Sequence, residues 1–177
     1  KYKLFDKKSA LLSGVKYYIS DNISEQGPGS AEYNADFNLA VDDYPFYPNQ
    51  SYYRYPNLNL AYFIENIFYV DSNFSITPGM RYEHINTKSD GYYRSIYLNL
   101  VNQPLYDTTV FNSNENKRDF FLFGIGLSYK NSKQYEVYSN ISQNYRSVTF
   151  SDITITSPTF LIDPDISDES GYSYDIG

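Results

Sequence analysis

Apolar and polar residues alternate through the middle of the chain, a pattern typical of β-strands. In residues 57–70 the even-numbered positions are apolar, with Asn66 the one exception. The odd-numbered positions include Asn59, Ala61 and Glu65, together with three apolar residues. Because successive side chains of a strand point to opposite faces, this segment predicts a strand with one apolar face and one face bearing charge.

The same alternation returns after a short break at 71–73. Residues 74–84 place apolar side chains at even-numbered positions from Phe74 to Tyr82, and polar or small side chains at the odd-numbered positions between them. The two strands together predict a sheet that is apolar on one side only. The wall of a bacterial outer-membrane β-barrel needs such a sheet, because lipid lies outside it and a polar lumen inside.

Five other segments predict strands, and their connections alternate in length. Because alternate turns of an antiparallel meander lie at the same end, the short connections share one rim and the long ones the other, as in bacterial barrels. A soluble β-sandwich has no reason for this parity. The sequence therefore predicts an all-β fold, an antiparallel up-and-down meander of about six strands that forms part of the wall of a large transmembrane β-barrel. The other strands are predicted at 1–5, 9–20, 118–130, 135–146 and 172–177, with short turns at 6–8, 71–73 and 131–134, long segments at 21–56, 87–117 and 147–169, and a small strand extension at 35–41.

The barrel prediction also states which side chains face lipid. They are the apolar residues on the apolar face of each strand, and we expect them to point outward and to be solvent-exposed in the isolated chain. The set comprises Leu58, Leu60, Tyr62, Phe74, Ile76, Phe121, Phe123 and Ile125.

Composition agrees with this reading. The mean hydropathy of the 177 residues is -0.54, and no run approaches the ~20 apolar residues of a membrane-spanning helix. A barrel strand needs only ~9–11 residues, half of them apolar, so this value does not exclude a barrel. The 22 tyrosines suit both strands and membrane–water boundaries.

Charge and cysteine content exclude other classes. A net charge of -7 disfavours nucleic acid as a partner, and the absence of cysteine excludes disulfides and thiolate metal sites. The single histidine, His84, is poor evidence for a metal site, which needs several converging ligands. With no nucleophile–base constellation, the sequence predicts neither an enzyme nor a cofactor. No signal peptide opens the chain, which we interpret as an excerpt of a longer, exported protein.

Four motifs in order resemble one known family. Ser75–Glu83, which reads SITPGMRYE, resembles a strand of TonB-dependent outer-membrane receptors, and residues 61–68 resemble the strand before it there. Residues 138–152, YSNISQNYRSVTFSD, and residues 163–172, DPDISDESGY, resemble two later stretches. Within the family the ferric citrate transporter branch is the most similar, and the resemblance covers most of the chain from Ser9 onward.

The resemblance implies a barrel of about 22 strands, plugged by an N-terminal domain and powered by the TonB energy-coupling protein through a missing N-terminal region. Residues 1–177 are then a partial barrel domain without the plug, because six or seven strands cannot close a barrel. It further implies a protein of the bacterial outer membrane, in contact with outer-membrane lipid, that imports an iron chelate, either ferric citrate or another siderophore. Two alternatives are a secreted aromatic-rich β-domain that binds carbohydrate and a passive porin-like barrel.

Two Tyr-Tyr-Arg triplets fall in the long segments of one rim. Arginine offers planar donors to carboxylates, and tyrosine supplies rigid contact area, so both triplets are candidates for binding an anionic chelate. The alternative is an aromatic-rich segment that packs on its neighbours or forms an interfacial girdle. With two arginines that point toward the polar face, the predicted ligand-binding residues are Tyr52, Tyr53, Arg54, Tyr92, Tyr93, Arg94, Arg81 and Arg146.

Charged residues of the polar face have two possible roles. Glu65, Arg81 and Glu83 are candidates for an ion-pair ladder along the lumen or against the plug, and the alternative is a solvated wall. Arg146 and Asp152 flank a strand end, where they either help to seat the plug or a loop, or cap the exposed end.

Overall fold

The computed structural model describes residues 2–4, 7–29, 39–131, 134–148, 163 and 166–177. In this part of the chain seven strands form one sheet, and each strand pairs antiparallel with the next in chain order. The predicted all-β antiparallel meander is therefore confirmed. The strands are β1 (Tyr2–Leu4), β2 (Lys7–Gln26), β3 (Ser51–Tyr69), β4 (Phe74–Leu98), β5 (Pro104–Asn131), β6 (Tyr135–Arg146) and β7 (Glu169–Ile176).

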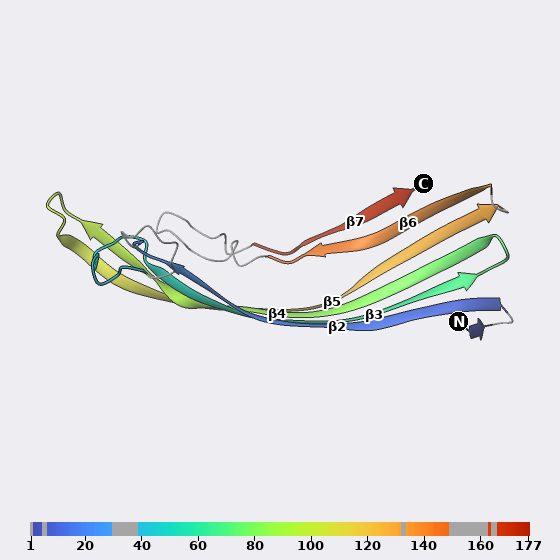
Figure 1. Cartoon of the computed structure of the whole chain (residues 1–177), viewed down its shortest axis with the longest axis horizontal. Helices are drawn as coiled ribbons and strands as arrows, with labels where there is room; N and C mark the ends of the chain where they lie inside the picture. Colours follow the sequence, from blue (N-terminus) through green and yellow to red (C-terminus); the bar gives the residue numbers. More distant parts are fainter. Residues whose placement is uncertain (1, 5–6, 30–38, 132–133, 149–162, 164–165) are drawn as a thin grey trace.

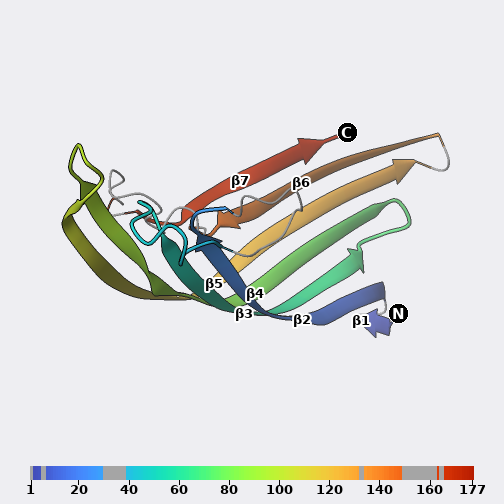
Figure 2. The same ribbon diagram turned by 60° about the vertical axis from the view of Figure 1, so that its left-hand side comes forward.

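The sheet is curved, with one concave and one convex face (Figure 1). The β3–β4 and β5–β6 turns and both ends of the chain lie at one end of it, which we call the short-turn end. The β2–β3 connection lies at the other end, where the β4–β5 hairpin projects furthest (Figure 2). The part of the chain that the structure describes contains no helix long and apolar enough to cross a membrane.

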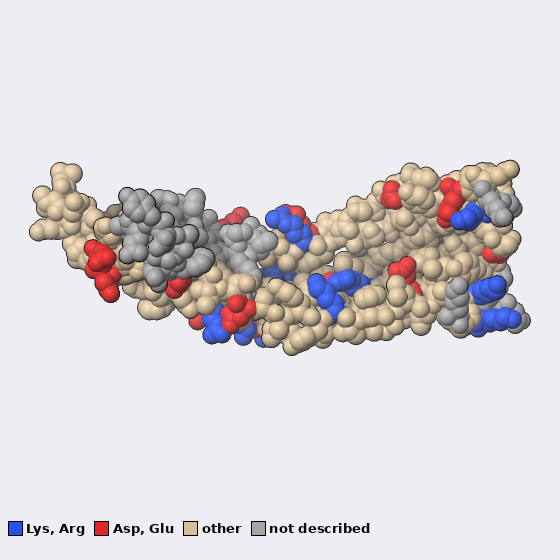
Figure 3. Space-filling model, in the orientation of Figure 1, with Lys and Arg blue, Asp and Glu red and all other residues tan. Residues whose placement is uncertain are grey.

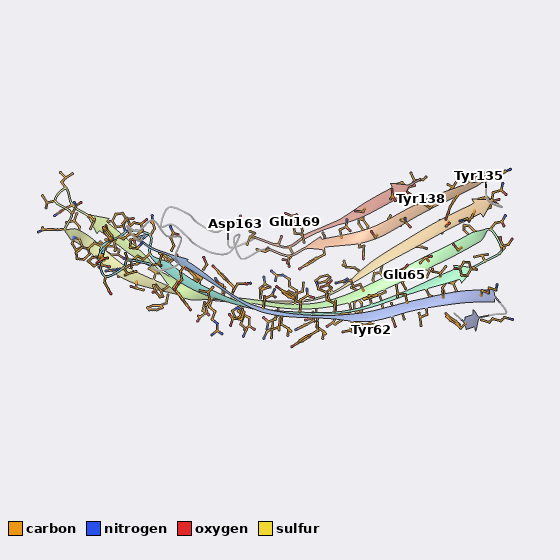
Figure 4. All side chains as sticks on the ribbon, viewed as in Figure 1. Tyr62, Glu65, Tyr135, Tyr138, Asp163 and Glu169 are labelled. Carbon is orange, nitrogen blue, oxygen red and sulfur yellow. The ribbon has the colours of Figure 1, made fainter. Side chains whose placement is uncertain are left out.

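Strand register aligns the apolar positions into a continuous band on the convex face. Val15, Tyr62, Tyr82 and Phe121 form one row across β2 to β5. Figure 4 shows Tyr62 on the convex side and Glu65, three residues further, on the concave side. Along the middle of the molecule the convex edge carries no charged side chain in the view of Figure 3. The band is therefore a contiguous exposed apolar surface, which is unfavourable in water.

The predicted outward residues all belong to this band by register, but they are not equally exposed. Leu58, Phe74 and Ile76 are only half-buried. The prediction of solvent exposure is therefore wrong for these three. The other five are exposed: Leu60 (38%), Tyr62 (44%), Phe121 (53%), Phe123 (54%) and Ile125 (44%).

Small residues on the concave face leave room for large neighbours. Gly14 pairs with Phe63, and a Cβ on Gly14 would lie 2.5 Å from the Phe63 ring. A Cβ on Gly126 would lie 2.7 Å from Asn140 Oδ1. Glycines at these positions let the side chains of adjacent strands lie flat across the sheet.

The expectation of a long loop at 87–117 is wrong. β4 continues to Leu98 and β5 begins at Pro104, so only a five-residue turn, 99–103, connects them. Asn99 closes this turn, since its Oδ1 accepts hydrogen bonds from the amides of Val101 (3.0 Å) and Gln103 (2.8 Å). β4 has 25 residues, whereas a strand needs only ~9–11 to cross a bilayer. More than half of the hairpin therefore extends beyond the apolar band, where neither face has to be apolar.

The segment predicted as a loop at 21–56 is also shorter than expected. β2 runs on to Gln26 and β3 starts at Ser51, with residues 21–26 paired to 51–56. The predicted strand extension at 35–41 lies mostly outside the described residues, and Leu39 forms an isolated bridge with Gly29. Asymmetry between the rims thus comes partly from strand length, not from connection length alone.

β5 and β6 separate part of the way along their length. Their ladder runs from the Asn131–Tyr135 pair only as far as Gly124 and Ser142. Figure 1 shows the β6–β7 hairpin lifting away from β5 beyond that point, toward the concave side. There, side chains replace ladder bonds: the amide of Phe123 donates to Gln143 Oε1 at 3.0 Å.

Candidate functional site

Both Tyr-Tyr-Arg triplets lie on strands rather than in loops, which corrects the sequence prediction of their location. β3 and β4 pair here in register, with Tyr52 opposite Tyr92, Ser51 opposite Tyr93 and Arg54 opposite Asp90. The two triplets therefore lie side by side on adjacent strands. The sheet holds them together beyond the apolar band, at the end where the β4–β5 hairpin projects.

Strand alternation divides each triplet between the two faces of the sheet. Tyr52 and Tyr92 stack with ring centroids 6.2 Å apart, and Phe111 adds a third ring 5.8 Å from Tyr92. Tyr53 points the other way, is only 1% exposed and stacks on Tyr55 at 6.1 Å. Burial raises the pKa of the Tyr53 hydroxyl. Tyr53 therefore serves packing, while Tyr52 and Tyr92 remain partly accessible.

Arg54 is held by one carboxylate. Its Nε donates to both Asp21 oxygens at 2.8 Å, and its Nη2 makes a further bond to Asp21 Oδ2. Hydrogen bonds from Arg54 lower the pKa of Asp21, so the pair stays ionised at neutral pH. The Arg54 side chain is 60% exposed, and Nη1 has no partner among the described residues. The group thus keeps donors available to a ligand.

All three guanidinium nitrogens of Arg94 donate hydrogen bonds within the fold. Nε and Nη2 donate to the Asp107 oxygens at 2.8 and 2.6 Å, and Nη1 donates to the Pro45 carbonyl oxygen at 2.6 Å. Nη1 also contacts Gln50 Oε1 at 3.4 Å, and the Arg94 amide donates to the Gln50 carbonyl oxygen at 2.8 Å. Arg94 therefore fastens residues 45–50 to the β4–β5 hairpin.

The concave face carries Arg81. Its Nε donates to Glu83 Oε1 at 2.5 Å, and the buried Glu83 also accepts from Asn59 Nδ2 at 3.1 Å. Of the three residues expected in an ion-pair ladder, only Arg81 and Glu83 form a pair, two residues apart on β4. Glu65 stays exposed on the same face and joins neither of them, since its partner across the ladder is Gly79. Nη1 and Nη2 of Arg81 have no partner in the described part of the chain.

Arg146 ends β6 and pairs with the first residue of β7. Nη1 donates to Glu169 Oε1 at 2.8 Å, and both side chains are largely exposed, at 62% and 70%. Exposed pairs of this kind contribute little to stability. Asp152, the predicted companion of Arg146, lies outside the described residues.

The residue that sequence reasoning missed is Arg118. Its side chain is 6% exposed, and the guanidinium donates to Asp168 Oδ2 at 2.6 Å and to Thr87 Oγ1 at 3.1 Å. Asp168 also accepts from the Tyr145 hydroxyl and, through Oδ1, from the Val148 amide at 2.8 Å. The Tyr145 ring lies 3.8 Å from that of Phe120. This cluster, the β5–β7 latch, bridges the place where β6 has left β5.

Electrostatics explain why the latch stays charged. Burial alone would raise the pKa of Asp168, but the hydrogen bonds from Tyr145, Val148 and Arg118 together lower it. Burial and the bond to Asp168 raise the pKa of Tyr145, which therefore remains a hydroxyl donor. No local sequence pattern could predict this pair, because Arg118 and Asp168 are 50 residues apart.

The described residues contain no group of three or more His, Asp or Glu side chains arranged to hold a metal ion. The Nδ1 atom of His84 lies 2.7 Å from Asp119 Oδ1, which also accepts from the Tyr82 hydroxyl at 2.6 Å. His84 thus belongs to a polar cluster of β4 and β5 on the convex face, level with Leu60 of the apolar band.

A curved antiparallel meander with an apolar convex band and a polar concave face defines a segment of a transmembrane β-barrel wall. Comparison with known families agrees: residues 4–177 match the family model described as TonB dependent receptor-like, beta-barrel. The chain therefore belongs to the TonB-dependent receptors, outer-membrane transporters of bacteria that bind ligands and TonB. No curated protein and no solved structure matches it.

Proposed function

We propose that this barrel segment belongs to a receptor that imports an anionic iron chelate, ferric citrate or another siderophore complex, with TonB as its energy source. The observation that carries the proposal is the pair of arginines on the concave face, which faces the lumen in such a barrel. Arg81 and Arg146 each use one guanidinium nitrogen on a carboxylate. The donors left over suit the carboxylates of a chelate.

The residues beyond the band have a separate role in this proposal, the first capture of the ligand. Arg54 keeps an unused Nη1, and the stacked Tyr52 and Tyr92 offer aromatic contact area beside it. Tyr53, Tyr93 and Arg94 support this surface from the sheet and the hairpin. The eight candidate residues thus form an outer group on β3 and β4 and an inner pair, Arg81 and Arg146.

Uptake of radioactive ferric citrate by cells that carry the full-length receptor tests the proposal. We expect Arg81→Gln with Arg146→Gln to reduce uptake about tenfold, because each lost charge-assisted contact costs about 1.5–3 kcal/mol before solvent screening. Lys16→Gln with Lys130→Gln, which removes two charges from the same face, is the matched control. Unchanged uptake at equal receptor levels would argue against the proposed role of the arginines.

Carbohydrate is the second candidate ligand, favoured by the ring cluster of Tyr52, Tyr92 and Phe111, since sugars bind on exposed aromatic faces. Phe111 is 77% exposed. Titration of the purified receptor with ferric citrate and, separately, with a maltooligosaccharide distinguishes the two. A passive porin differs from both, because its uptake would continue after the membrane potential is collapsed.

A further inference from the structure

A trough crosses the concave face of the sheet next to Arg81. Gly79 on β4 pairs with Gly124 on β5, and Glu65 on β3 and Ser142 on β6 continue the row on either side. Because the two central positions have no side chains, the backbone of β4 and β5 is open between taller neighbours. The floor of the trough is therefore peptide backbone that a ligand can approach closely.

The trough has the size of a small-molecule site. The hollow beside Arg81 has a volume of about 300 Å³, and a second hollow of about 400 Å³ adjoins it toward the short-turn end and shares its floor. The lining of the first hollow includes the apolar Phe63 and Leu122 and the polar Ser142 and Gln143. Sites for small ligands likewise combine apolar walls with a few polar groups.

Two opposite charges line the first hollow. Arg81 lies opposite Phe63, and Glu65 follows Phe63 by two residues on the same face (Figure 4), so Arg81 and Glu65 are diagonal neighbours on adjacent strands. Diagonal neighbours of this kind lie about 7–8 Å apart. No ion pair joins the two: Arg81 binds Glu83 through Nε, and Glu65 has no hydrogen bond or ion pair within the described part of the chain.

Other charges of the concave face lie too far away to satisfy Glu65. Within one row of Glu65 on either side, Arg81 is the only charged residue among the concave positions of β2 to β5. Lys8 and Lys16 on β2 lie two rows away in opposite directions, and the charged residues of β6 and β7 lie at least three strands away in the sheet. Glu83 offsets the charge of Arg81, so the Glu65 carboxylate stays unbalanced while Arg81 keeps two nitrogens free to donate.

We propose that the trough binds an amphoteric iron chelate, with a carboxylate of the chelate on Arg81 and an ammonium group of the chelate on Glu65. A chelate that carries carboxylates alone would place like charges beside Glu65, which is unfavourable. The glycine floor accommodates the bulk of the chelate between the two charged contacts. This inference rests on the proposed function, because Arg81 contacts the chelate in both, and it narrows the chelate to one chemical class.

Three related trihydroxamate complexes of iron serve as probes for the purified full-length receptor. Ferrioxamine G is linear, with an ammonium at one end and a carboxylate at the other, ferrioxamine B keeps only the ammonium, and ferrioxamine E is the uncharged macrocycle. Because the linear form can close into that macrocycle, its two charged ends can lie close together. We expect equilibrium titration to show an affinity that falls about tenfold from ferrioxamine G to ferrioxamine B, and further to ferrioxamine E.

Glu65→Gln separates this proposal from the proposed function. It should weaken the binding of ferrioxamine G about tenfold and strengthen that of ferric citrate, because citrate then meets no opposing carboxylate. Glu136→Gln, which removes a carboxylate from the same face at the short-turn end, is the matched control and should change neither affinity. Gly79→Ala should weaken the binding of both chelates, because its Cβ would enter the hollow while remaining in ordinary contact, 3.7 Å, with Glu65 Cγ.

Two sets of results would overturn the proposal. Equal affinity for the three ferrioxamines, or no binding of any of them, would show that the charged ends are not recognised. An equal effect of Glu65→Gln and Glu136→Gln would assign the selectivity to overall charge. If ferric citrate binding still depended on Arg81 in either case, the proposed function would stand and the amphoteric class alone would be rejected.

Discussion

At the scale of single residues, Gly91 has no room for a side chain. A Cβ at this position would lie 2.0 Å from the Tyr52 carbonyl oxygen and 2.7 Å from Tyr53 Cα, both backbone atoms. Gly91→Ala must therefore push β3 and β4 apart at the triplets. We expect a loss of about 1–3 kcal/mol and faster amide exchange at Tyr52 and Tyr53, measured by hydrogen exchange on the purified receptor.

Gly171 supplies the matched control for this prediction, because nothing lies within 4 Å of a Cβ built there. Gly171→Ala should leave exchange at the triplets unchanged. Unaltered exchange in Gly91→Ala as well would mean that the close approach of the two strands does not matter for their pairing.

Asp168 is the centre of the β5–β7 latch, so its charge should matter for stability. Asp168→Asn removes the charge that Arg118, 6% exposed, faces, and we expect a loss of about 1–3 kcal/mol in unfolding free energy. Thermal unfolding in detergent micelles measures it. Glu169→Gln, at an exposed ion pair next along the chain, should have a much smaller effect.

The pH dependence of the latch follows from the direction of the pKa shift. Asp168 has a lower pKa in the folded state than when unfolded, so the unfolded chain binds its proton first as pH falls. Its stabilisation is complete above the unfolded pKa of about 3.9 and is lost as pH drops through the lower folded pKa. A wild-type and Asp168→Asn difference that persisted unchanged at pH 2 would contradict this assignment.

At the scale of the elements, the convex band sets the position of the membrane. Ile76 on β4 and Phe123 on β5 belong to it, and Arg at either position would have to enter hydrocarbon. We expect Ile76→Arg and Phe123→Arg to cost about 2–4 kcal/mol each near the midplane. Unfolding in lipid vesicles measures the cost. Thr77→Arg, one residue from Ile76 on the concave face, is the control, and equal stability of all three would place the band elsewhere.

The sequence predicted the parts of the strands whose outward face would contact lipid. Residues 57–70 and 74–84 alternate visibly because one face must be apolar. The outer half of the β4–β5 hairpin has no such requirement. Its register is held instead by cross-strand ion pairs such as Arg94 with Asp107 and Lys88 with Glu115. Because polar residues lie on both faces of these strands, their sequence has no alternation and was predicted as a loop.

The candidate site was predictable in composition but not in arrangement. Both Tyr-Tyr-Arg triplets lie at the same end of the sheet as expected, yet they lie on paired strands, and alternation buries Tyr53 and leaves Tyr52 partly accessible. The partners of Arg54 and Arg94 depend on register over 33 and 13 residues. The Arg118–Asp168 pair depends on how β6 and β7 fold back over β5, which no local pattern encodes.

At the scale of the whole molecule, an anionic chelate meets a chain of net charge -7, so local positive charge must guide it. Arg54 is the outer arginine with an unused donor, and Asp21 offsets its charge. If Arg54 captures the chelate, Asp21→Asn should speed association and Arg54→Ala should slow it, each by roughly two- to fivefold at low ionic strength. Both effects should fade in 0.5 M salt, because screening shortens the reach of the charge. Stopped-flow binding of ferric citrate to the full-length receptor measures these rates.

Glu136→Gln is the control. It makes the same change of charge at the short-turn end, where Glu136 pairs with Lys130, and it should leave the association rate unaltered. A faster rate in Glu136→Gln equal to that in Asp21→Asn would assign the effect to overall charge, and equal rates in all four proteins would move the capture step away from Arg54.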